Sequence, residues 1–453
     1  MKIKILDHLI PGYTEKFLAG QYGSEEMPLL KAIGNKYIDE VKKFDLKNIY
    51  IVACQHILEP QLEMFKLFIQ AGIEACHIII LPKVYSANIE IIAELKNIGC
   101  LVVDEALQFE SNESFDNFHQ RQTKILSAFV MNYVPTTGQI IILDDGGMLI
   151  QSFAQMIDSE HDRQLYGVEQ TASGKNKLLT KNLPFIVTSV ASSIEKIEIE
   201  TDYIIRLAMV RIKEYFAIHN ISSTAKILIL GQGPIGLTLI KALRKEGFDC
   251  SAYDLSDGQN PHCLSDYDVI IGASGANSVN TDQLSILKEG CHLISVSSSD
   301  REFPAVFIRK NTDSGKDIHD TFIYRFHKVY LANGGFPITF KGNRSECFPL
   351  EMDVTMMKLS EAVFHHIIKR TDLKASVNDL YWWKKISLLK KSIFLSIILL
   401  IGVLIFKLMF YGWTMAPLYL QLTIIAILIS CSIPAIWSIY FYKKLESYLH
   451  KKA

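Results

Sequence analysis

Short apolar stretches alternate with segments of helical periodicity along the first 150 residues, and this pattern limits the fold more than any other feature. The apolar stretches predict buried strands at residues 49–53, 77–81, 101–103 and 140–143. Residues 61–70 and 87–98, which lie between them, have the periodicity of helices. Such alternation predicts an α/β fold in which helices cover both faces of a parallel sheet. Ligands of such sheets bind at the carboxyl ends of the strands.

Polar residues follow two of these predicted strands. The first strand is followed by Cys54-Gln55-His56, and the fourth runs into Asp144-Asp145-Gly146-Gly147. Because the carboxyl ends of parallel strands share one edge of a sheet, we expect His56 and Asp145 to contact a ligand there. Two alternatives stay open. His56 could cap the helix that follows it, and Asp145 could start a turn with the two glycines.

A glycine-rich turn opens a second α/β unit. A strand at 226–230 is followed by Gly231-Gln-Gly233-Pro-Ile-Gly236 and by a helix at 237–245. Asp254 ends the next strand, eighteen residues beyond Gly236. In this arrangement the glycines let the backbone approach a pyrophosphate, and the acid accepts hydrogen bonds from a ribose diol. The pattern predicts a Rossmann-like domain that binds NAD rather than NADP, the alternative being a purely structural turn.

A second turn of small residues follows the strand predicted at 268–271. It contains Gly275 and could pass beneath the cofactor, or it could be an ordinary strand-to-helix loop.

The C-terminal region carries almost no charge. Residues 392–406 are uncharged, and after Lys407 the next charged residue is Lys443. Stretches of about 20 apolar residues are long enough to cross a bilayer as helices, which predicts spans at 391–411 and 416–441. Lysines precede the first stretch and follow the second, so we expect a membrane-anchored protein with both termini in the cytoplasm. A buried helical hairpin is the alternative.

Charge and cysteine content exclude other classes of protein. The 47 Lys and Arg residues nearly balance the 48 Asp and Glu residues, which predicts no basic face for nucleic acid. The eight cysteines include no C-x-x-C pair, so the sequence predicts neither a metal site nor a disulfide framework.

Taken in order, the motifs resemble those of the S-adenosylhomocysteine hydrolase family. Residues 25–28 are similar to its E-N-E-M-P-G segment, residues 53–56 to G-C-L-H, and residues 142–147 match I-L-D-D-G-G. Residues 167–174 follow G-I-S-E-E-T-T-T-G in shortened form, and the glycine-rich turn with Asp254 comes next. The resemblance covers residues 20–340. It implies a homo-oligomer in which bound NAD oxidises a ribose hydroxyl so that homocysteine can be eliminated.

The resemblance implies roles for individual residues. His56 matches the histidine near the leaving group, and Asp145 matches the carboxylate of D-D-G-G. Thr171 and Ser173 match two threonines that contact the cofactor. Gln170 stands where a glutamate would bind the ribose, and an amide cannot replace a carboxylate.

The proton-transfer residues of that family are changed in this chain. Without a gap, its catalytic lysine falls on Ile194, and Lys196 could serve only after a local shift. Ser298 stands in place of a histidine. General acid and base groups are each worth about 10²–10⁴ in rate, so these losses predict very slow turnover.

We therefore expect two doubly wound Rossmann-like domains and a C-terminal transmembrane hairpin. The expected parts are a substrate-type domain at 1–200, an NAD-binding domain at 201–345, a helical segment at 346–385 and the hairpin at 386–453. The expected function is a membrane-anchored pseudoenzyme that senses an adenosine-like or nucleotide ligand. The alternatives are a divergent hydrolase or oxidoreductase, with Lys196 or His56 as base, and an oligomerising scaffold without a ligand.

Overall fold

The structure is a computed structural model that describes residues 3–157, 163–191, 193–254, 264–312, 317–341 and 347–368. All of these residues belong to one compact unit, Met1–Asn378. The hairpin predicted at 386–453 lies outside the described residues. The division of the chain into the four predicted parts stays a prediction.

The first sheet is parallel, and its strands lie in the order β3-β2-β1-β4-β5-β6. Its strands are β1 (Ile49–Ile57), β2 (Ile78–Ala87), β3 (Leu101–Val102), β4 (Gln139–Asp144), β5 (Leu165–Glu169) and β6 (Ile186–Ser189). The two central strands, β1 and β4, are almost completely buried because helices cover both faces. The chain leaves β1 toward one side and returns to β4 on the other, so the switch point of this doubly wound sheet lies between them.

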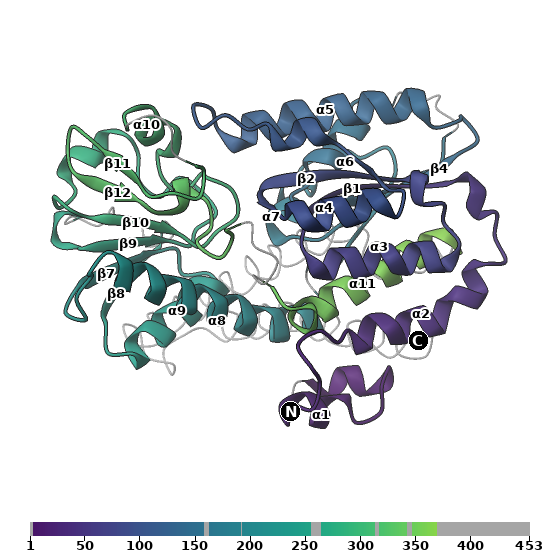
Figure 1. The fold of residues 1–453 in the computed structure, drawn as a ribbon, viewed down its shortest axis with the longest axis horizontal. Helices are drawn as coiled ribbons and strands as arrows, with labels where there is room; N and C mark the ends of the chain where they lie inside the picture. The colour runs from purple at the N-terminus through teal and green to yellow at the C-terminus, as the bar shows by residue number, and fades with distance from the viewer. Residues whose placement is uncertain are drawn as a thin grey trace, which may run out of the picture. The chain divides into compact units, whose positions relative to one another are not determined.

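Helices pack on both faces of the first sheet (Figure 1). The helices of this part of the chain are, in order, α1 (Tyr13–Leu18), α2 (Pro28–Val41), α3 (Glu59–Ala71), α4 (Ile89–Asn97), α5 (Phe115–Tyr133), α6 (Met148–Ala154) and α7 (Ala172–Leu178). The next helix, α8 (Ile194–Ile218), belongs to the hydrophobic core of the second sheet. The last described helix, α11 (Pro349–Ile367), packs against α2 and α3 in the same hydrophobic core. Asp353 of α11 accepts hydrogen bonds from the Leu29 and Leu30 amides (2.8 and 2.9 Å), so it caps the start of α2.

The second sheet has the order β11-β12-β10-β9-β7-β8, and β11 alone runs antiparallel to its neighbour. Its strands are β7 (Lys226–Leu230), β8 (Asp249–Tyr253), β9 (Val269–Gly272), β10 (His292–Ser295), β11 (Phe322–Tyr324) and β12 (Val329–Leu331), with helices α9 (Pro234–Lys245) and α10 (Ala305–Lys310). The switch point lies between β7 and β9, next to the glycine-rich turn. The prediction of an α/β fold with two such sheets is confirmed.

The prediction of a membrane localisation is wrong for the part of the chain that the structure describes. None of its helices is both long enough and apolar enough to cross a bilayer. The longest, α5, α8 and α11, all carry charged residues, which a span of about 20 residues rarely tolerates. The two stretches predicted as spans, 391–411 and 416–441, lie outside the described residues.

Candidate functional site

A buried ion pair occupies the carboxyl edge of the first sheet, at its switch point. The Lys83 ammonium in β2 contacts the Asp145 carboxylate, which follows β4, and the side chains are only 5% and 3% exposed. His56 of β1 approaches the other oxygen of Asp145 at 3.3 Å, and its Nδ1 bonds the Ser86 hydroxyl. The structure thus brings together His56 and Asp145, two of the residues predicted from the sequence.

The ion pair fixes the charges of both partners. Burial favours the neutral acid, but the Lys83 and His56 charges outweigh it and hold the pKa of Asp145 well below its usual range. Burial also favours neutral lysine, yet the carboxylate holds the pKa of Lys83 above its usual value. Lys83 therefore stays protonated. It can orient Asp145 or attract an anion, but it cannot act as a general base.

The sequence analysis missed Lys83 because it ended this strand at residue 81, whereas β2 continues to Ala87. A lysine inside an almost continuous apolar strand was the available signal. Such a residue is rarely buried without a partner of opposite charge.

Two further carboxyl groups lie beneath this pair. Asp144 and Glu169 are register partners at the ends of β4 and β5, and both are fully buried. Asp144 Oδ2 accepts the Ile150 amide (2.8 Å), and Glu169 Oε1 accepts the amide and hydroxyl of Thr171 (both 2.7 Å). Their other oxygens, Asp144 Oδ1 and Glu169 Oε2, have no hydrogen-bond partner.

Burial and mutual repulsion make this pair reluctant to ionise. Burial raises the pKa of Asp144 to about 6. Burial and the neighbouring Asp144 charge raise the pKa of Glu169 to about 8. The sequence analysis overlooked Glu169 and took the adjacent Gln170 as the ligand-binding position.

Gln170, which follows β5, is in contact with Lys196 of α8. The Lys196 ammonium donates to the Gln170 carbonyl oxygen at 2.6 Å, and both residues are buried. Neither is among the residues that line the cavity at the carboxyl edge. A role for Lys196 as a base stays a prediction, and the position of its ammonium does not favour that role.

A small cavity of about 30 Å³ opens at this edge. Its lining includes Asp145 together with Thr171 and Ser173, the two positions predicted to contact a cofactor. The remaining lining residues are Lys83, Tyr85, Phe115, Asp116, His119, Gly146, Met148, Lys177, Ser298, Ser299 and Arg301. This volume is far below the range for small-molecule sites, so a ligand could enter only if the lining side chains moved apart.

The predicted dinucleotide turn follows β7. A Cβ on Gly231 (φ +108°) would lie 2.7 Å from the Ala273 backbone, and one on Gly236 would overlap the Gly231 carbonyl oxygen. These two glycines therefore allow the close approach of turn, helix and neighbouring loop. A Cβ on Gly233 would instead meet no protein atom within 4 Å. Asp254 ends the adjacent strand, where its carboxylate accepts the Gln232 amide (2.7 Å).

The Gly275 turn lies beside this one, since Ala273 is the residue that Gly231 approaches. Glu302, which is fully buried, holds the turn in place by accepting the Gly275 amide (2.5 Å) and the Ser274 hydroxyl (2.9 Å). The hydroxyls of Ser278 and Ser297 donate to the same carboxylate. The sequence analysis did not single out Glu302, because its partners are brought together only by the fold.

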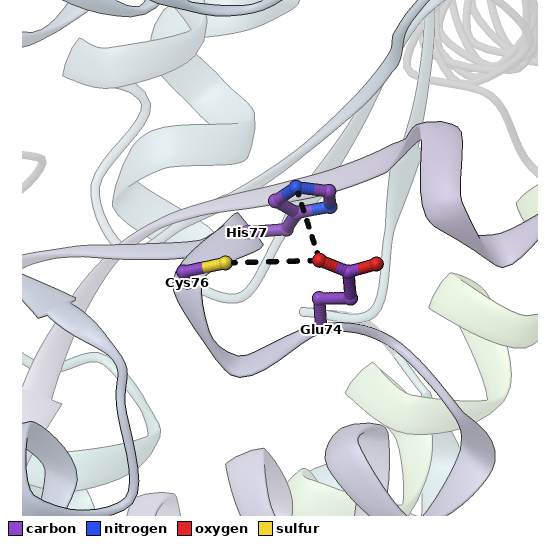
Figure 2. A group of neighbouring side chains, drawn as sticks. All are labelled: Glu74, Cys76 and His77. Atoms are coloured by element: carbon purple, nitrogen blue, oxygen red, sulfur yellow. Dashed lines mark hydrogen bonds and ion pairs between the residues drawn. The ribbon is translucent and has the colours of Figure 1, made fainter.

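One group of side chains in the described residues has the composition of a metal site. It consists of Glu74, Cys76 and His77, which cluster in the short turn before β2 (Figure 2). Glu74 and Cys76 are exposed, and the Glu74 carboxylate lies 3.8 Å from the His77 ring. The turn is at the amino end of β2, away from the cavity, and the His77 ring stacks on Tyr50. Nothing in this geometry links the group to the carboxyl edge.

Comparison with known proteins finds relatives in Mycobacterium tuberculosis. The chain is 31% identical over 341 residues to the uncharacterized protein Rv0104 of Mycobacterium tuberculosis, a match that covers 73% of this chain and 67% of the relative. The same values hold for protein MT0113 of a second strain of that organism. The chain belongs to the family of these mycobacterial proteins. A scan against models of protein families finds no match.

Solved structures with some likeness to this chain are more distant than these family members. A dipicolinate synthase from Bacillus halodurans is 12% identical, with 71% of this chain and 98% of that chain covered and a TM-score of 0.34. An NAD-dependent formate dehydrogenase from Staphylococcus aureus, in complex with NAD, is 10% identical, with 70% and 95% covered and a TM-score of 0.35. These scores are low, and no residue of this chain takes a role from them.

Proposed function

We propose that this protein binds NAD at the Gly231–Gly236 turn and an adenosine-like ligand at the carboxyl edge of the first sheet, without appreciable hydrolase turnover. The observation that carries the proposal is the open space at Gly233. Two glycines of the turn are needed for packing, whereas the third is needed only if another molecule approaches the backbone there. Asp254 stands at the strand end from which it can reach a ribose diol. Gly275, Thr171 and Ser173 are proposed cofactor contacts.

The proposed ligand contacts on the first sheet are His56 and Asp145. Asp145 lines the cavity, whereas His56 is not among the lining residues and would act on the ligand through the Asp145 carboxylate. Gln170 is buried below this edge, so in this proposal it supports the site rather than binding the ligand directly.

We expect little turnover because of the positions in which the two lysines near the site are held. Lys83 is held as an ammonium by Asp145, and the Lys196 ammonium donates to the Gln170 carbonyl oxygen. Neither lysine is placed to accept a proton from a ligand in the cavity. NAD would supply the hydride chemistry when bound, and neither of these two lysines offers a base for the elimination that has to follow.

An activity assay separates this proposal from its enzyme alternative. S-adenosylhomocysteine is added to NAD-loaded protein, and free homocysteine is measured by its thiol, with an active hydrolase as the reference. We expect release at least a thousandfold below the reference. Release at the rate of the reference would make the protein a divergent hydrolase. Failure to bind either NAD or adenosine would favour the scaffold alternative, and oligomeric state is measured separately by light scattering.

The cofactor site is tested by replacing Gly233 with valine. The new side chain would project into open space, so we expect the protein to fold normally. The valine side chain would occupy the space through which the pyrophosphate reaches the backbone amides of the turn. We expect this to weaken NAD binding by about a hundredfold, or roughly 3 kcal/mol. Calorimetric titration with NAD measures the loss, and thermal unfolding checks the fold.

Gly236→Ala provides the contrast, because its methyl group would overlap a backbone oxygen and destabilise the fold itself. Unchanged NAD affinity in the valine variant would rule out the proposed site.

A further inference from the structure

Lys177 is the least compensated cation of the cavity wall. It lies in α7, and its ammonium donates to the Gly146 carbonyl oxygen at the rather long distance of 3.3 Å. No carboxylate of the described residues forms an ion pair with it. Partial burial and the positive charge of Arg301 lower its pKa, although the Asp116 carboxylate acts in the opposite direction. Its surroundings therefore favour an additional negative charge.

The other charges of the wall are already paired. Lys83 is matched by Asp145, and Arg301 donates to Asp116 at 2.8 Å. His119 adds no charge at neutral pH, because burial lowers its pKa to about 3. Three cations and two carboxylates line the cavity, so the charge left over is that of Lys177.

A constrained loop holds Arg301 at the cavity. Ser299, which also lines the cavity, has a left-handed backbone (φ +69°) that is unfavourable for a residue other than glycine. Its hydroxyl accepts the Arg301 Nε (3.3 Å), while the neighbouring Asp300 is anchored by Arg309. This loop stands where the hydrolase family has its histidine, and it places a guanidinium at the wall instead.

We propose that the cavity binds an anionic group of its ligand, a phosphoryl or carboxylate group, between Lys177 and Arg301. This inference rests on the proposed function for the nucleoside part of the ligand. The ligand class is then a nucleotide or an acidic nucleoside rather than adenosine itself. An anion next to Lys177 would accept a hydrogen bond from the ammonium and also neutralise its charge, which the uncharged Gly146 carbonyl oxygen cannot do. Arg301 can donate to the same anion without leaving Asp116, because a guanidinium has five N–H groups.

Calorimetry on NAD-loaded protein tests the inference with three ligands: adenosine, AMP and adenosine-5′-carboxylic acid. We expect at least one of the two anionic ligands to bind tenfold or more tightly than adenosine, and comparison of the two identifies the anionic group. Lys177→Met should remove the advantage of the anionic ligands over adenosine, and Lys177→Arg should preserve most of it. Lys175→Met is the matched control, since it removes a charge from the same helix but does not line the cavity.

Inorganic phosphate provides a probe that does not depend on the nucleoside. We expect its ³¹P resonance to broaden with the wild-type protein and with Lys175→Met, and to stay narrow with Lys177→Met. If adenosine binds as tightly as both anionic ligands, or if Lys177→Met behaves like wild type, the anion site is refuted while the proposed function survives. If no nucleoside ligand binds but phosphate still broadens in a Lys177-dependent way, the anion site stands and the proposed function fails.

Discussion

Replacing Arg309 with methionine should lower the free energy of unfolding by about 3–5 kcal/mol. The Arg309 guanidinium is completely buried and pairs with Asp300 at 2.7 Å. It also donates to the carbonyl oxygens of Ser111, Glu113 and Gly334 at 2.6–2.7 Å. Methionine fills a similar volume but donates no hydrogen bond, so the variant would leave a buried carboxylate without its cation and three carbonyl groups without their donor.

Urea denaturation followed by circular dichroism measures this effect. The control is Arg121→Met, which breaks the pair between Arg121 (56% exposed) and Glu113 and should cost less than about 1 kcal/mol. A loss of under 1 kcal/mol in the Arg309 variant would contradict the role given to this buried pair.

Replacing Glu169 with glutamine should remove much of the pH dependence of stability between about pH 5 and pH 8. The pKa of Glu169 is raised in the folded protein, to about 8, so the native state binds this proton more tightly than the unfolded chain does. The wild-type free energy of unfolding therefore falls as the pH rises through this window. For a group this buried we expect a fall of roughly 2–5 kcal/mol. Glutamine does not titrate, and its amide oxygen can still accept the Thr171 hydrogen bonds.

Urea midpoints at pH 5 and pH 8 check this prediction. Asp268→Asn is the control of opposite sign: although its partial burial acts against ionisation, Lys288 lowers the pKa of Asp268. This carboxyl is then charged in both the folded and the unfolded state above pH 5. Its loss should therefore change the free energy of unfolding by the same amount at pH 5 and pH 8, without changing how that free energy depends on pH. Equal slopes in wild type and the Glu169 variant would show that Glu169 is ionised throughout.

The parts of this molecule that were predictable from sequence are those encoded by local pattern. Continuous apolar runs indicated the central strands β1 and β4, and the polar residues at their ends, His56 and Asp145, do meet in space. The spacing of Gly231, Gly233 and Gly236 between a strand and a helix indicated the turn after β7. In each case the signal lies within a few residues of the element it describes.

The unpredicted residues depend on partners far away in the chain. Lys83 is matched by Asp145, and Arg309 is held by the segment around Ser111, almost two hundred positions earlier. In the sequence such residues look like any surface charge, because their burial is decided by packing. Glu169 was missed for a different reason: the shortened motif directed attention to Gln170, its neighbour, which points elsewhere.

The position of α11 affects how this protein can be made. This helix completes the core around α2 and α3, and Asp353 caps α2, yet the chain reaches it only after building the whole second sheet. During synthesis on the ribosome, part of the apolar surface of α2 and α3 stays exposed to solvent until residues 349–367 emerge and α11 covers it. A gene fragment that stops before residue 349 should therefore yield an aggregation-prone product, because the core of the first sheet needs a helix that follows the second sheet in the chain.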